Sequence, residues 1–237
     1  MSFGECNGDL YAAIKPAIYK RIDGPTPTWE KVYEYPPIPG DKPSWLGGSS
    51  GMRGLTAIPN PKGDGEVLLM GFESLALAGY SAGAKIVYLN PSDNYSVTTE
   101  LDLGAFLKGQ FKERWSAKWY YVITPFNDML SVKDPNTGED LLMLGGWHVD
   151  DEGNSGSWYL VRHADASYTL HEVPYLFGFR GWPKYLNGVR TIALSPFTAD
   201  NSQVLYMGGC TAGPLIKLHN TAWVYSVDIN TALGISK

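Results

Sequence analysis

The residues best suited to acid and base chemistry stand just after an apolar run that closes on Gly145-Gly146. His148 follows this run and precedes Asp150. An imidazole beside carboxylates could bind a divalent ion or form an acid and base pair. His219 occupies the corresponding segment of the next repeat, so the two histidines could approach one another. The alternative is a polar loop with no chemical role, and the histidines are too dispersed to predict a metal site from spacing.

A second group consists of oxygen-bearing side chains at the ends of expected strands. Glu73 follows Gly71-Phe72, and Asn127 and Asp128 follow Pro125-Phe126. Ca²⁺ accepts such ligands without strict geometry, so a calcium ion is one candidate cofactor. The competing interpretation is that Asn127 and Asp128 cap a turn.

Two arginines share a position in their repeats. Arg53 and Arg190 each begin an apolar segment that ends at proline. A guanidinium there could recognise a carboxylate or phosphate through two parallel hydrogen bonds. An ion pair or carbonyl contacts between neighbouring repeats would explain the same residues.

Aromatic residues are abundant, with 8 Trp and 15 Tyr. A ring exposed in a loop or beside a glycine could stack on a sugar or another apolar ligand face. Packing between sheets is the alternative for most of them. The tryptophans considered are Trp115, Trp119, Trp147, Trp158 and Trp182, of which Trp147 and Trp182 are the predicted ligand-binding residues.

The elements that must position these residues recur along the chain. Segments 66–72, 140–146 and 203–209 share one pattern, in which a polar residue precedes four apolar residues and a glycine, and segment 8–13 is a weaker copy. Each is predicted to be a short buried strand that its glycines end. A strand rich in Tyr or Trp follows at 17–23, 85–90, 157–162 and 221–228.

Further strands complete the repeat. Segments 29–33, 95–101 and 168–173 alternate with a period of two, as outer strands do. Segments 53–59 and 190–196 precede the glycine-ended strand, and 120–125 fills that place in the third copy. The unit therefore has four antiparallel strands and recurs at intervals of about 60 to 75 residues. Residues 103–112 are expected to form one short helix.

This order of strands, with Gly145-Gly146 and Gly208-Gly209 followed by Trp158 and Trp223, resembles kelch-type and related β-propellers. The resemblance implies an all-β propeller of four to five blades, each of four antiparallel strands, or part of a larger propeller. The resemblance covers about residues 8–230. The chain is expected to form one propeller domain, 1–237, with repeats near 2–36, 52–103, 119–175 and 188–230. Lactonase-like and esterase-like propellers hold a central calcium ion.

The expected strands fall short of a closed ring. The first repeat begins with its glycine-type strand, preceded by residues 2–6, and the last repeat stops after its aromatic strand. Either a terminal segment supplies the missing outer strand, or the chain is part of a larger ring.

Composition limits the partners. The formal charge of −5 and the pI near 5.4 argue against a general binder of nucleic acids or anionic membranes. No window reaches the roughly 18 apolar residues of a membrane helix. Neither a signal peptide nor a disulfide framework is evident, since Cys6 and Cys210 could form one bridge at most. Cytoplasm is the default location, and a mature secreted form is the alternative.

Three functions remain open at this stage. The first is recognition of a carbohydrate or another small ligand by loops of the scaffold. The second is a metal-assisted hydrolase or lactonase, in which Glu73, Asn127, Asp128 and His148 surround an ion. The third is a platform for protein partners. Because propellers host all three, the fold does not decide whether the chain is an enzyme.

Overall fold

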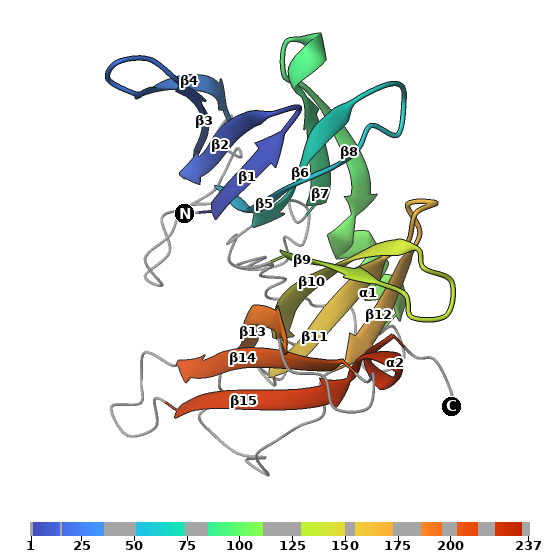
Figure 1. Ribbon diagram of the computed structural model, residues 1–237. Helices are drawn as coiled ribbons and strands as arrows, with labels where there is room; N and C mark the ends of the chain where they lie inside the picture. Colours follow the sequence, from blue (N-terminus) through green and yellow to red (C-terminus); the bar gives the residue numbers. More distant parts are fainter. Residues whose placement is uncertain are drawn as a thin grey trace. The chain divides into compact units, whose positions relative to one another are not determined.

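The computed structural model is an all-β molecule whose strands form four antiparallel sheets (Figure 1). It describes residues 2–14, 16–35, 51–73, 85–110, 129–149, 155–172, 186–195, 203–212 and 221–233. The chain divides into two compact units, Met1–Pro125 and Phe126–Lys237, each of which contains two sheets. Within the described ranges, no helix has the length and apolar character needed to cross a membrane.

The first unit holds two four-stranded sheets in which neighbours in sequence are neighbours in space. The first sheet consists of β1 (Ser2–Cys6), β2 (Asp9–Ile14), β3 (Ala17–Ile22) and β4 (Thr28–Glu34). The second consists of β5 (Gly51–Pro59), β6 (Glu66–Glu73), β7 (Lys85–Asn90) and β8 (Ser96–Asp102). The short 3₁₀-helix η1 (Pro91–Asp93) joins β7 to β8, and α1 (Leu103–Gln110) follows.

The second unit repeats this plan with one fewer described strand. Its first sheet consists of β9 (Met129–Lys133), β10 (Asp140–Val149), β11 (Ser155–Arg162) and β12 (Tyr168–Glu172). Its second sheet has three described strands, β13 (Leu186–Leu194), β14 (Val204–Ala212) and β15 (Thr221–Asp228), and α2 (Ile229–Ala232) follows.

Most predicted strands are confirmed, because their apolar runs are long enough to be buried. The segments predicted at 85–90 and 221–228 are β7 and β15, and the helix predicted at 103–112 is α1. Residues 2–6 form β1, which sequence reasoning did not assign as a strand. In the third repeat the described first strand is β9, and the predicted segment 120–125 lies outside the described residues.

The prediction that glycines end the second strand of each repeat is wrong. β6, β10 and β14 all continue past their glycines. The register points to a different role for these glycines, because Gly146 lies opposite Trp158 and Gly209 lies opposite Trp223. Directly opposite residues share a face of the sheet, so the missing side chain at Gly146 leaves space for the buried indole ring of Trp158. In β6, where Phe72 replaces the second glycine, the opposite residue is Lys85.

Each unit has its own apolar core between its two sheets. In the first unit β1 packs against β5, and Gly4 permits the approach, since a Cβ atom there would lie 3.3 Å from both Cγ and the carbonyl oxygen of Leu55. In the second unit β10 and β11 pack against β13. The first core is formed by Cys6, Tyr11, Ala13, Ile18, Leu55, Leu68, Met70, Val87 and Leu89. The second is formed by Val132, Leu141, Met143, Tyr159, Val161, Ile192, Leu205, Met207, Ile229 and Ala232.

Replacement of Trp158 tests the cross-strand packing in the second unit. The Trp158 side chain is completely buried, so Trp158→Ala removes a large apolar group and leaves a cavity. We expect a loss of about 3 to 5 kcal/mol in the free energy of unfolding. Urea denaturation followed by circular dichroism measures it. The control is Trp29→Ala, at a half-exposed position, where we expect a much smaller loss; equal losses would contradict this packing.

Candidate functional site

The first sheet displays a group of exposed aromatic and charged side chains near the turn between β3 and β4. Phe3 and Trp29 are 52% and 45% exposed, and their ring centroids lie 6.2 Å apart. Arg21 lies directly opposite Trp29 in the register of β3 and β4. Its Nε atom is 3.0 Å from Oδ1 of Asp23. We call Phe3, Arg21, Asp23 and Trp29 the Trp29 cluster.

The alternation of strands explains why these side chains face away from the core. Ile18 belongs to the core of the first unit, so Tyr19 and Arg21 point to the opposite face. Phe3 lies opposite Ala12, which in turn lies opposite Tyr19, and this places Phe3 on the same face. The cluster can therefore offer apolar ring surface and a charged pair to a ligand from one side.

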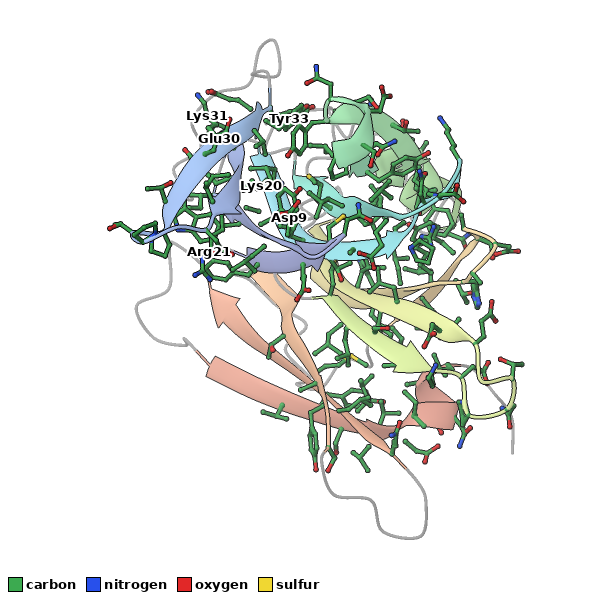
Figure 2. All side chains as sticks on the ribbon, turned by 45° about the horizontal axis from the view of Figure 1, so that its top comes forward. Asp9, Lys20, Arg21, Glu30, Lys31 and Tyr33 are labelled. Atoms are coloured by element: carbon green, nitrogen blue, oxygen red, sulfur yellow. The ribbon has the colours of Figure 1, made fainter. Side chains whose placement is uncertain are left out.

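The first sheet also carries charged residues on β2, β3 and β4, among them Asp9, Lys20, Arg21, Glu30 and Lys31 (Figure 2). The Nζ atom of Lys20 lies 2.5 Å from Oδ2 of Asp9, and this hydrogen bond raises the pKa of Lys20. Lys31 forms a similar pair with Glu34 at 2.5 Å. Because both groups of the second pair are half exposed, that pair contributes little to stability.

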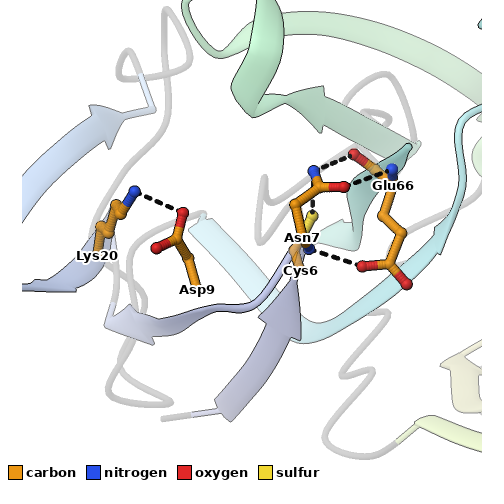
Figure 3. Close-up of polar contacts among 5 residues, drawn as sticks. All are labelled: Cys6, Asn7, Asp9, Lys20 and Glu66. Atoms are coloured by element: carbon orange, nitrogen blue, oxygen red, sulfur yellow. Dashed lines mark hydrogen bonds and ion pairs between the residues drawn. The ribbon is translucent and has the colours of Figure 1, made fainter. Parts of the chain in front are cut away.

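The turn between β1 and β2 is tied to the second sheet by one asparagine (Figure 3). The Nδ2 atom of Asn7 donates to the carbonyl oxygen of Glu66 at 3.0 Å, and Oδ1 accepts from the Glu66 N–H at 2.9 Å. The Asn7 N–H donates to the Glu66 carboxylate at 2.7 Å. The asparagine thus pairs with one residue of β6 as a neighbouring strand would.

Local conformation makes this pairing accessible to Asn7. Asn7 and Gly8 both have positive φ, 51° and 80°, in the two-residue turn that joins Cys6 to Asp9. Asn-Gly is the residue pair that such hairpin turns favour. Gly65, with φ of 78°, also has to be small, because a Cβ atom there would lie 3.0 Å from Oδ1 of Asn7.

Beside this turn lies the buried thiol of Cys6. Burial, together with the nearby carboxylates of Glu66 and Asp9, raises its pKa to about 11. Nδ2 of Asn7 lies 3.6 Å from the sulfur atom. Cys6 is a free cysteine, so the structure has no bridge between Cys6 and Cys210. A thiol that stays protonated is a poor nucleophile, which makes Cys6 a part of the core.

The second unit contains one histidine in an apolar environment. His171 of β12 lies opposite Tyr159 in the register, and the two rings stack with centroids 4.9 Å apart. Among the described residues, Nε2 of His171 has no hydrogen-bond partner, although it is buried. Burial lowers the pKa of His171, and the nearby His163 lowers it further. The hydroxyl of Tyr159 donates to the carbonyl oxygen of Ala232, which ties β11 to α2.

The residues singled out from the sequence are not described as one site. Five lie on strands whose backbone is described, although their side chains are not: Arg53, Glu73, Trp147, His148 and Arg190. The other five lie outside the described residues: Asn127, Asp128, Asp150, Trp182 and His219. Their roles stay predictions.

Three of these residues lie within strands, whereas the sequence placed them at or beyond strand ends. His148 is inside β10, opposite Gly156, because the strand runs on past its glycines. Arg53 and Arg190 lie inside β5 and β13, where the predicted strands would have begun. In both cases the register to the next strand shifts at or beside the arginine. A β-bulge re-aims the side chains around it, so the repeats share a local distortion as well as a residue type.

Metal binding receives no support from the described part of the chain. Among those residues, no three His, Cys, Asp or Glu side chains come together to hold an ion. The proposed calcium ligands Asn127 and Asp128 are not among them.

The Trp29 cluster and Asn7 were both missed by sequence reasoning. Trp29 was recognised as the first residue of an outer strand, whereas Trp158, which was considered for exposure, is completely buried. A tryptophan that follows the turn-rich segment 23–28 on an alternating outer strand would have indicated exposure of Trp29. Asn7-Gly8 is a strong hairpin signal that would have identified β1.

No family model, curated protein sequence or solved structure matches this chain.

Substitution of Asn7 tests the tie between the sheets of the first unit. Asn7→Gly keeps the left-handed backbone accessible but removes both side-chain hydrogen bonds to Glu66. We expect a loss of about 1 to 2 kcal/mol in the free energy of unfolding, measured by urea denaturation. Asn94→Gly is the control, since Asn94 has a φ of 47° in the turn before β8. Equal effects at both positions would show that backbone conformation alone is responsible.

The pH dependence of stability tests the environment of His171. Its pKa is lowered from 6.5 in the folded state, so the folded protein binds fewer protons than the unfolded chain. Stability is therefore complete above pH 6.5 and decreases as the pH falls through the folded-state pKa. His171→Phe keeps a ring for Tyr159 to stack on and removes the titration. We expect urea denaturation at a series of pH values to show a weaker decrease in the variant, and an unchanged decrease would contradict this account.

Proposed function

We propose that this chain is a ligand-binding protein of β-propeller type that recognises a carbohydrate or another small ligand. The observation that carries the proposal is the pair of exposed rings Phe3 and Trp29 beside the Arg21 and Asp23 ion pair. Exposed aromatic rings with a few polar groups at their edge suit a ligand that has one apolar face and hydroxyl groups around it.

A sugar ring has this chemistry. The C–H groups on one face of a pyranose can stack on Trp29, while Arg21 donates to hydroxyl oxygens and Asp23 accepts from hydroxyl groups. The Arg21 and Asp23 pair is well suited to this role because each holds the other in place. Their side chains are 40% and 82% exposed, so they remain accessible to a ligand.

The propeller arrangement is supported by the repetition of the sheets. Each sheet is an antiparallel meander in which consecutive strands are neighbours, as in a propeller blade. The first two sheets also share a register shift at the same place, between Ile18 and Tyr19 and between Ile86 and Val87. Trp29 lies near the start of the outer strand β4, beside the turn that precedes it. In a propeller this position is at the outer rim of a blade, which neighbouring blades do not cover.

The hydrolase or lactonase and the platform for protein partners stay predictions. The first depends on Glu73, Asn127, Asp128 and His148, whose side chains the structure does not describe. The second has no described feature that favours it over recognition of a small ligand. Trp147, Trp182, Arg53 and Arg190 remain predicted ligand-binding residues on the same scaffold.

A glycan array tests the proposal. We expect the wild-type protein to bind a defined group of glycans and Trp29→Ala to lose about fivefold or more in affinity, because stacking on an aromatic ring contributes on the order of 1 kcal/mol. Tyr206→Ala is the matched control, since Tyr206 is an exposed aromatic residue, 41% accessible, in the other unit.

Two outcomes would contradict the proposal. Absence of binding to every glycan by the wild-type protein would remove carbohydrate as the ligand class. Equal binding by the wild-type protein and Trp29→Ala would remove the Trp29 cluster as the site and leave Trp147 and Trp182 as the residues to replace next. Both variants should keep the wild-type melting temperature within a few degrees, because each position is exposed.

A further inference from the structure

Among the described strands, β15 forms the edge of its sheet, whereas the third strand of each of the other three sheets is followed by a fourth. In those sheets β4, β8 and β12 pair with the third strand of the meander. In the described part of the chain, β15 pairs with β14 alone. The residues that follow β15 form α2, whose Ile229 and Ala232 are buried in the core of the second unit. Those residues therefore do not continue into a fourth strand.

β15 is uncharged except at its end. Positions 221–227 contain no charged residue, and Asp228 is the last residue of the strand. The outer strands β4 and β8 carry charges within the strand, which oppose pairing with another strand, whereas the one charge of β12 stands at its end. These charged residues are Glu30, Lys31 and Glu34 in β4, Glu100 and Asp102 in β8, and Glu172 in β12.

The register shows which backbone groups of β15 face the open edge. The Ile229 N–H donates to the carbonyl oxygen of Gln203 at 2.9 Å, and Asp228 lies opposite Val204. Hydrogen-bonded pairs alternate along an antiparallel ladder, so Val227 and Tyr225 direct their backbone groups at β14. Ala222, Val224 and Ser226 consequently direct their N–H and C=O groups away from β14. Val224 is also the most exposed of the large apolar residues described, at 71%.

We propose that the open edge of β15 pairs antiparallel with β15 of a second copy of this chain, so that the two three-stranded sheets become one. In such a twofold ladder Val224 of one copy faces Val224 of the other, and Ala222 faces Ser226. Their outward N–H and C=O groups then form hydrogen bonds that are otherwise left to water. The interface is isologous, which is the commonest geometry of homodimers.

A second copy suits this edge better than a strand of another composition. Because positions 221–227 are uncharged, pairing of β15 with itself brings no like charges together. With Val224 at the centre, the two Asp228 carboxylates lie at opposite ends of the ladder. One pair of short strands buries less surface than a stable protein interface, so we expect a reversible dimer with a dissociation constant in the micromolar range.

Sedimentation velocity on the full chain tests the proposal. From low to high micromolar concentration, we expect the mass to rise from that of the 26.0 kDa chain toward twice that value. Val224→Pro removes an outward N–H group and keeps every hydrogen bond to β14, so we expect this variant to stay monomeric. Val224→Thr has nearly the same shape and keeps the N–H group, so it should dimerise like the wild type.

Ser226→Pro supplies an independent check, because Ser226 also faces the open edge and is exposed. It should be monomeric, with the wild-type circular dichroism spectrum, even if Val224→Pro fails to fold. A wild-type chain that stays monomeric at all concentrations would overturn the proposal. So would a folded proline variant that dimerises as the wild type does.

Discussion

Burial of the central strands on both faces is the constraint on which the rest of this structure depends. Leu68 and Met70 of β6 point into the core of the first unit, and their neighbours Val67 and Leu69 point to the other face. All four side chains are completely buried. β10 and β11 repeat this arrangement, since Leu144, Trp158 and Leu160 are as inaccessible as Met143 and Val161 of the core. A strand that is apolar on both faces needs a strand on each side to satisfy its backbone hydrogen bonds and packed layers over both faces to exclude water. The four-stranded meander supplies the strands on each side.

The glycines serve the same constraint. A strand that is apolar throughout would crowd its neighbour wherever a tryptophan has to be accommodated. Gly146 and Gly209 lie opposite the tryptophans of the next strand, whereas Phe72 lies opposite Lys85. In two repeats a glycine thus lies opposite a tryptophan, whereas in the repeat with Phe72 the opposite residue is a lysine. The same space requirement explains Gly4, where β1 approaches the backbone of Leu55.

The candidate binding surface and the open edge arise where this burial ends. On the first sheet, the face away from the core leaves Phe3 and Trp29 half exposed next to charged groups. Among the described strands of the last sheet, the ladder stops at β15, whose one charge, Asp228, is at its end. The charges within β4 and β8 fit strands that remain at an edge, and the uncharged positions 221–227 of β15 carry the inference of self-pairing. The proposed ligand recognition and the proposed self-association therefore involve different units of the chain.

Much of the fold could be predicted from the sequence alone, because burial leaves a strong pattern in short strands. Apolar runs, alternating outer strands and the repeat of about 60 to 75 residues determined the all-β class and most of the strands. The prediction that glycines end their strands was wrong. The sequence shows that a side chain is missing at a glycine, but it does not show whether the glycine ends a strand or makes room for a residue on the neighbouring strand, as Gly146 does for Trp158.

Only the tertiary structure decided which polar and aromatic residues are accessible and which backbone groups meet. Trp29 lies on the outer strand β4 and is 45% exposed, whereas Trp158 lies on the third strand β11 and is completely buried. Asn7 and Glu66 are 59 positions apart, and no local pattern connects them. Accessibility and long-range pairing depend on how sheets pack and on register, whereas strand formation depends on nearby residues. The sequence by itself therefore determined the strands and their repetition, and packing between sheets decided the candidate site.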